Sequence, residues 1–113
     1  AKVEIDLENM KTTNLRVIAA VAGGGVPGAE SSMLKIRGTE IRQEILSLIR
    51  RAGGVAAVSY IDEAQYGGYA EAHVGEEEVA TAAANYFNYR KLSIFGGSNE
   101  IQKNIISKMI LGL

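Results

Sequence analysis

The sequence of 113 residues contains no cysteine, no tryptophan, one proline and one histidine. Without cysteine, a disulfide scaffold and a thiolate metal site are both excluded. The single histidine, His73, cannot build a site of several histidine ligands or share a proton relay with a second histidine. The 12 Lys and Arg residues nearly balance the 13 Asp and Glu residues. This balance gives no reason to expect a nucleic-acid or an anionic membrane partner.

Long hydrophobic runs are also missing. No apolar stretch approaches the roughly 18 residues that a membrane span needs, and no signal peptide opens the chain. We therefore expect a cytoplasmic protein. The length and the 47% hydrophobic content fit one folded domain.

Helical periodicity dominates the first half of the sequence. The first helix reaches from the start of the chain to the glycine-rich segment 23–28, which cannot continue a helix. A second helix starts around Glu30 and ends at Gly53, with Gly38 in its interior indicating a close helix neighbour. The apolar positions of these two helices are Val3, Leu7, Met10, Val17 and Val21 in the first, and Leu34, Ile41, Ile45, Leu48 and Ala52 in the second.

Two further helices are predicted in the second half. The apolar run 55–60 is the only strand candidate, so we interpret residues 55–75 as a packed connection. The third helix follows Gly75, with Glu76–Glu78 in its first turn, and the fourth begins after Ser98 as its N-cap. Their inner faces comprise Val79, Ala82, Ala83, Tyr86 and Tyr89 in the third, and Ile101, Ile105, Met109 and Gly112 in the fourth. The predicted fold class is all-α, an antiparallel four-helix bundle.

Three local patterns favour an ordinary structural role. Residues 23–28 satisfy GxGxxG, but they follow a helix and contain a proline, which does not fit a dinucleotide-binding unit. His73 and the run Glu76–Glu78 fit a surface loop and a solvated helix start better than catalysis or metal binding. The aromatic and basic residues of segment 86–91 resemble single-strand nucleic-acid binders, but their helical spacing favours core packing.

The segment Gly96-Gly97-Ser98-Asn99 allows two interpretations. Its glycines let the backbone approach another group closely, and the helix start that follows can attract an anion or a phosphate. An ordinary tight turn with a serine cap explains the same residues. The spacing alone favours the turn.

Residues 89–106, YRKLSIFGGSNEIQKNII, closely resemble the C-terminal signature of acyl-CoA dehydrogenases. That signature has an Arg, then Ile-Tyr/Phe, Gly/Glu-Gly-Thr/Ser and Asn-Glu-Ile-Gln, and a short apolar end. The closing segment 109–113 and the stretch Glu30–Lys35 are also similar to the family. The resemblance covers nearly the whole chain and is weakest over residues 55–75.

The resemblance implies a fragment of a larger flavoenzyme, of which residues 1–113 are the later part of the C-terminal helical bundle. The start at Ala1 rather than Met agrees with that interpretation. The parent enzyme would oxidise the Cα–Cβ bond of an acyl-CoA thioester, with FAD as hydride acceptor and an electron-transferring flavoprotein as the next carrier. The fragment alone would be inactive. Because an incomplete bundle exposes an apolar stripe, we expect the isolated chain to form a homo-oligomer.

The resemblance also carries site residues onto this chain. Ser98, Asn99 and Glu100 correspond to the turn that contributes to FAD binding, with Gly97 permitting the approach. We expect alanine at Ser98 and Asn99 to weaken FAD retention. Phe95 would line the acyl pocket. Arg90 matches a basic position whose role is either structural or related to the cofactor.

The sequence differs from many family members at Gly96, the position at which they carry the catalytic glutamate. Glycine has no side chain and cannot transfer a proton, so we predict no catalytic residue and no metal ligand in this chain. Either the base comes from a region upstream, or the chain is a catalytically silent subunit of a heteromeric enzyme. A free-standing helical interaction module is the remaining alternative.

Overall fold

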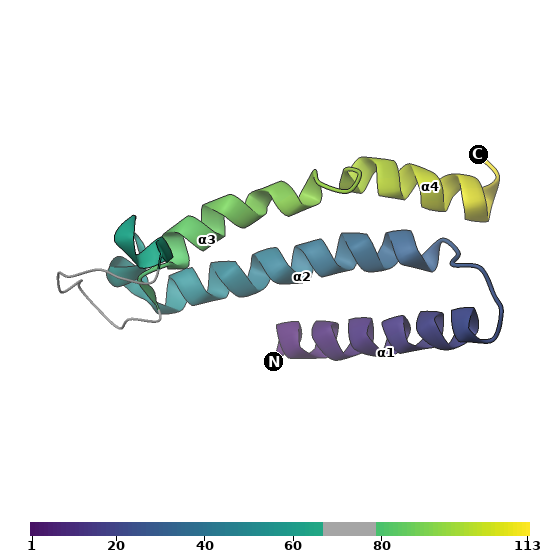
Figure 1. Ribbon diagram of the computed structural model, residues 1–113, viewed down its shortest axis with the longest axis horizontal. Coiled ribbons are helices and arrows are strands. Elements are labelled where there is room, and N and C mark those ends of the chain that lie inside the picture. Colours follow the sequence, from purple (N-terminus) through teal and green to yellow (C-terminus); the bar gives the residue numbers. More distant parts are fainter. Residues whose placement is uncertain (67–78) are drawn as a thin grey trace. The chain divides into compact units, whose positions relative to one another are not determined.

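The computed structural model describes residues 1–66 and 79–113, and these residues form helices and turns without a strand. The α-helices are α1 (Lys2–Ala22), α2 (Glu30–Ala52), α3 (Ala82–Asn88) and α4 (Asn99–Leu111) (Figure 1). Short 3-10 helices cover Gly54–Ala57, Glu63–Tyr66 and Tyr89–Ser93. The predicted all-α fold class with four helices is confirmed. None of the described helices is long and apolar enough to cross a membrane.

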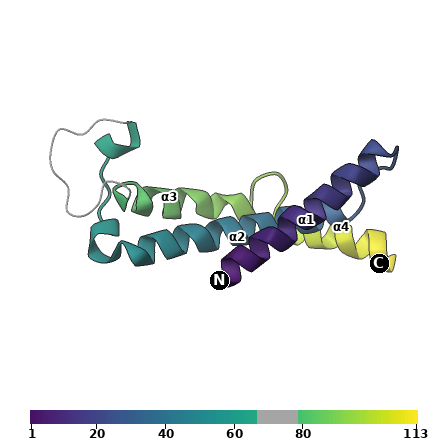
Figure 2. The same cartoon turned by 90° about the horizontal axis from the view of Figure 1, so that it is seen from below.

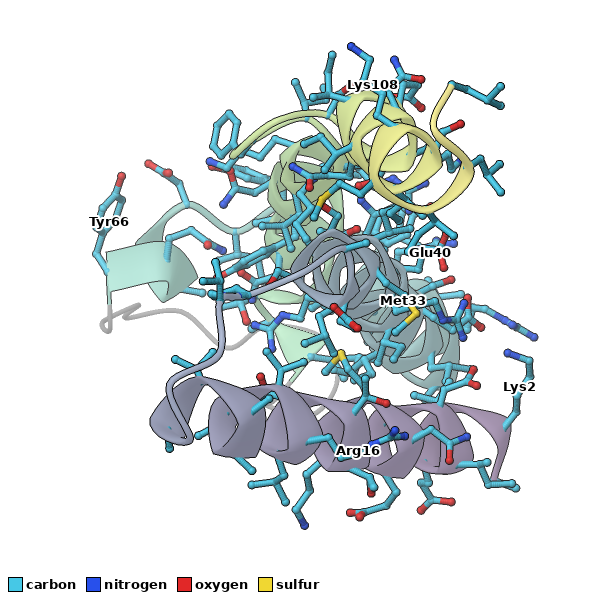
Figure 3. All side chains as sticks on the ribbon, turned by 90° about the vertical axis from the view of Figure 1, so that its right-hand side faces the viewer. Lys2, Arg16, Met33, Glu40, Tyr66 and Lys108 are labelled. Atoms are coloured by element: carbon cyan, nitrogen blue, oxygen red, sulfur yellow. The ribbon has the colours of Figure 1, made fainter. Side chains whose placement is uncertain are left out.

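The chain forms two compact units. The first consists of residues 1–41 and 91–113, and the second of residues 42–90. In the first unit, α1 and α4 lie on opposite sides of the first part of α2, and both run antiparallel to it (Figures 1 and 3). Figure 2 shows α1 crossing α2 at an angle.

The contact between α1 and α2 combines an ion pair with a close approach. An Arg37 guanidinium nitrogen lies 3.3 Å from an Asp6 carboxylate oxygen, which joins the two helices. A Cβ placed on Gly38 would lie 3.4 Å from the Met10 sulfur. The close helix neighbour predicted from the interior glycine is therefore α1, which presents the flexible side chain of Met10 there.

The first helix matches its predicted inner face only in part. Val3, Met10 and Val17 are half-buried, whereas Leu7 and Val21 are exposed. In α2 the buried positions include Ile41, which was predicted, and Ile36 and Leu46, which were not. Both helices keep apolar surface that the described residues do not cover.

The buried residues described in the second unit are mostly small. Ala57 at the end of the first 3-10 helix is fully buried, and Ala80, Ala82, Ala83 and Leu46 are also buried in this unit. In the described part of the predicted packed connection, Ala57 is buried and Ala56, Ile61 and Ala64 are half-buried, whereas Val55 and Val58 remain exposed. The third helix begins at Ala82 and ends at Asn88, a shorter span than predicted, and Tyr89–Ser93 continue it as a 3-10 helix. Glu76–Glu78, His73 and the residues around Gly75 lie outside the described residues.

The inner face predicted for α4 is wrong. Ile101 and Met109 are more than half exposed, and Ile105 is exposed as well. The side of α4 that is half-buried contains Asn99, Gln102 and Ile106 instead. The physical reason is that the Asn99 side chain forms hydrogen bonds with Lys35 and Thr39 of α2, as described below. These hydrogen bonds decide which face of α4 meets the neighbouring helix. Figure 3 shows Lys108 on the far side of α4, pointing away from α2.

Candidate functional site

The start of α4 is formed by two glycines and a capping serine. Gly96 and Gly97 have φ angles of 65° and 85°, in the left-handed region that glycine adopts without a steric cost. Ser98 has an extended backbone, and its hydroxyl oxygen accepts a hydrogen bond of 3.4 Å from the Ile101 amide. The predicted N-cap is therefore confirmed, and the two glycines supply the sharp change of direction before it.

Gln102 closes the turn from the side of the helix. Its side-chain amide donates a hydrogen bond of 3.2 Å to the Gly96 carbonyl oxygen. A Cβ on Gly97 would lie 2.8 Å from the same amide nitrogen, too close for any other residue without a shift of Gln102. Within the chain, the Gln102 side chain is therefore a group that approaches Gly97 closely. Sequence reasoning did not assign Gln102 this role, although its distance of one helical turn from Ser98 is a usable signal.

The Glu100 carboxylate lies at the N-terminal end of α4. Its pKa is lowered, first by a hydrogen bond from its own backbone amide and then by the Ser98 hydroxyl, with smaller contributions from the charges of Lys103 and Lys35. A negative group at this position also complements the helix dipole. Glu100 is therefore an ionised hydrogen-bond acceptor at neutral pH.

The Asn99 side chain points toward α2 and is half-buried. Its Oδ1 atom accepts a hydrogen bond of 3.0 Å from the Lys35 ammonium group. Its Nδ2 atom lies 3.3 Å from the Thr39 hydroxyl oxygen. The three side chains connect two helices whose sequence positions differ by 60 or more residues.

Phe95 and Gly96 precede this turn. Phe95 is 57% exposed, and the Lys91 ammonium lies 5.3 Å from the centre of its ring. No side chain is available at Gly96, and the three polar residues that follow are engaged with each other or with α2 as described above. The described residues therefore place an apolar ring beside the turn and no side chain at the position of the expected base. No group of His, Cys, Asp or Glu within the described part of the chain could hold a metal ion.

In the second unit, arginines stack on tyrosines. The Arg50 and Arg90 guanidinium carbons lie 4.8 and 5.3 Å from the centre of the Tyr86 ring. Arg42 stacks on Tyr89 at 4.9 Å. Such contacts bury the ring faces while leaving charged groups near solvent. The predicted core packing of the aromatics is wrong for Phe87, which is 68% exposed, and holds only in part for Tyr86 and Tyr89, which are half-buried under arginines.

Comparison with known proteins gives one match. The family model described as "Acyl-CoA dehydrogenase, C-terminal domain" matches residues 1–111. This range includes all four α-helices and the turn at the start of α4. No curated protein and no solved structure matches the chain.

Proposed function

Because the chain belongs to the acyl-CoA dehydrogenase C-terminal domain family, we propose that it is the C-terminal helical domain of a longer flavoenzyme. That enzyme would oxidise the Cα–Cβ bond of acyl-CoA thioesters. The single observation that carries the proposal is the turn from Gly96 to Glu100, whose two left-handed glycines and capped helix start match the segment that the family resemblance relates to FAD.

The residues of this turn fit FAD in a specific way. An ionised Glu100 at the end of α4 repels a second anion, so the turn is unsuited to the pyrophosphate of the dinucleotide. The same carboxylate, with the Ser98 hydroxyl beside it, can accept hydrogen bonds from hydroxyl groups. Ser98 and Glu100 would therefore hold a hydroxyl-bearing part of FAD. When bound, FAD supplies the hydride acceptor.

The base that removes the α-proton is not proposed among these residues. Gly96 has no side chain, and the lowered pKa of Glu100 makes its carboxylate a weak proton acceptor. We therefore propose that the base lies on another part of the enzyme. A silent subunit of a heteromeric dehydrogenase is the second candidate, and the glycine at position 96 is the observation that favours it.

The apolar surface of α1 and α4 supports a role in assembly. Both helices are fully described, and neither contains a buried residue. Large apolar side chains that stay exposed in a single chain are typical of surfaces that other protein segments cover. We propose that homo-oligomer formation covers part of this surface. The acyl-CoA substrate and an electron-transferring flavoprotein would be the partners of the whole enzyme.

Substitution of Ser98 tests the proposed FAD contact. In the full-length protein, we expect Ser98→Ala to raise the Kd for FAD by about tenfold, the value of one hydrogen bond of roughly 1.4 kcal/mol. Fluorescence titration of the flavin-free protein measures that constant. Ser107→Ala makes the same chemical change later in α4 and serves as the control.

A loss of the helix cap must be separated from a loss of the contact. Ser98→Gly removes the hydroxyl but costs the helix only a few tenths of a kcal/mol as an N-cap. The proposal expects both Ser98 variants to weaken FAD binding. An unchanged Kd in both would contradict the assignment of Ser98 to the cofactor.

A further inference from the structure

The side chain of Asn99 faces α2 rather than the open end of α4. Lys35 and Thr39 lie one helical turn apart on α2, and both contact the Asn99 amide. All three side chains are half-buried. Ser98 and Glu100, the residues on either side of Asn99, contact each other instead of α2.

The donors and acceptors of this cluster fix the orientation of the Asn99 amide. An ammonium group can only donate, so the oxygen of Asn99 must face Lys35, and the amide nitrogen then faces Thr39. The Thr39 hydroxyl has one proton, which it donates to the Ile36 carbonyl oxygen, 2.8 Å from the hydroxyl oxygen. The Asn99 side-chain oxygen lies farther from this hydroxyl oxygen, at 3.4 Å, and cannot receive the same proton. Thr39 therefore accepts from Asn99, and each polar group has a complementary partner.

We propose that Lys35 and Thr39 are positioning residues that hold the turn from Gly96 to Glu100 through Asn99, and that Asn99 does not itself contact the cofactor. The proposal corrects the role that the family resemblance carried over to Asn99. It rests on the proposed function only for its effect on FAD, because the contacts between α2 and α4 exist without the cofactor. Asn99 is bonded directly to Ser98 and Glu100, so fixing its side chain also fixes their backbone.

Lys35 also acts on the turn through its charge, and the experiment must separate this effect from the hydrogen bond to Asn99. Its charge lowers the pKa of Glu100, as does the charge of Lys103. Lys103 is therefore a matched control, because it shares the electrostatic effect on Glu100, while among the described residues the ammonium that donates to Asn99 is that of Lys35. A role through the Asn99 hydrogen bond predicts a larger effect at Lys35 than at Lys103, and a role through charge alone predicts the reverse or equality.

A double-mutant cycle with Lys35→Met and Asn99→Ala tests the proposal in the full protein. The first readout is the equilibrium constant of unfolding, measured in urea. We expect the effects of the two substitutions on this constant to deviate from independence by a factor of about three to ten. The second readout is the Kd for FAD. We expect each single variant to raise it by about fivefold and the double variant to raise it no further, because either change releases the same turn.

Each outcome decides a different claim. Absence of coupling in unfolding would overturn the positioning role, whatever happens to FAD. Additive losses of FAD affinity would show that Asn99 contacts the cofactor and would overturn the second half of the proposal. If Lys103→Met has the same effect as Lys35→Met, the charge of Lys35 and not its hydrogen bond to Asn99 is responsible, which overturns the positioning role. If the unsubstituted protein takes up no FAD, the proposed function fails, and the coupling in unfolding still decides the role of Lys35.

Discussion

The two compact units bury different kinds of surface. Among the described residues, the unit of residues 42–90 buries mainly alanines, with Ala57 at 0% exposure and Ala80 and Ala83 at 2% each, together with Leu46 of α2. In the other unit, α1 and α4 bury no residue, and the buried side chains come from α2 and the residue before it. The unit of residues 42–90 therefore has a centre of mostly small residues, whereas the other unit has two helices whose large apolar side chains stay exposed in the single chain.

The last turns of α1 show this difference most clearly. Residues 15–22, LRVIAAVA, contain one charged residue, and Leu15 and Ile18 are 58% and 54% exposed. A helix that is apolar on nearly all sides is normally buried on nearly all sides. The end of α1 therefore has the composition of a core helix and, in the single chain, the exposure of a surface helix.

The largest expected effect comes from placing a charge on this part of α1. Leu15→Lys should lower the association constant of the chain by about 30-fold to 1,000-fold, because an unpaired ammonium in an apolar interface costs about 2–4 kcal/mol. Leucine and lysine have similar helix propensities, so α1 itself should persist. Sedimentation equilibrium and circular dichroism measure the two quantities.

Asn9→Lys provides the control for that substitution. It adds the same charge to an exposed polar position of the same helix. We expect its association constant to stay near that of the unsubstituted chain. A monomeric unsubstituted chain at high concentration, or equal losses in both variants, would show that α1 does not mediate association.

Alanine substitutions at two glycines allow the packing in the two units to be compared directly. A Cβ on Gly53 would lie 2.7 Å from the Ala57 Cβ and 2.8 Å from a Val79 methyl carbon, so Gly53→Ala should destabilise the chain by about 1–3 kcal/mol. A Cβ on Gly38 would meet only the flexible Met10 side chain. Because glycine weakens a helix interior, Gly38→Ala should stabilise the chain by up to about 1 kcal/mol.

Urea unfolding of the two variants measures both changes. Changes of opposite sign in the free energy of unfolding would confirm that the packing around Gly53 has no spare volume and that the approach of α1 to α2 at Gly38 has some. Destabilisation by both variants would mean that the approach at Gly38 is as tight as the packing at Gly53.

The sequence predicts the local features of this molecule well. The bounds of α2 follow from its periodicity and from the glycines that flank it, and the N-cap Ser98 follows from residue type and position. These features depend on neighbours within a few residues, which a single sequence displays directly.

Features that depend on distant residues were predicted less well. Ile101, Ile105 and Met109 form a regular apolar stripe, but a single sequence does not say which face of a helix meets which neighbour. In α4 that choice follows from the hydrogen bonds between Asn99 and the side chains of Lys35 and Thr39, which lie 64 and 60 residues away in the sequence. The family resemblance matches residue types and does not show where a side chain points, so it could not reveal that the Asn99 amide faces α2.

The smallest expected effect concerns the ion pair between α1 and α2. The pKa of Asp6 is lowered mainly by the hydrogen bond from Lys2. Burial opposes this effect, and the charges of Lys2 and Arg37 add smaller lowering contributions. Because the pKa is lower in the folded than in the unfolded chain, the stabilisation is present above the ordinary pKa of an aspartate. It is lost as the pH falls through the lowered value.

Asp6→Asn should therefore reduce stability slightly at pH 7 and make unfolding less dependent on pH in the acidic range. The effect is small because Lys2 and Arg37 are largely exposed, where solvent and salt weaken ion pairs. Arg37→Gln should give an intermediate pH dependence, since the hydrogen bond from Lys2, the larger cause of the shift, remains. Urea unfolding at several pH values between 7 and 3 tests this order. If Asp6→Asn retains the full acidic loss of stability, other carboxylates cause that loss, and the contact of α1 with α2 then depends on apolar packing alone.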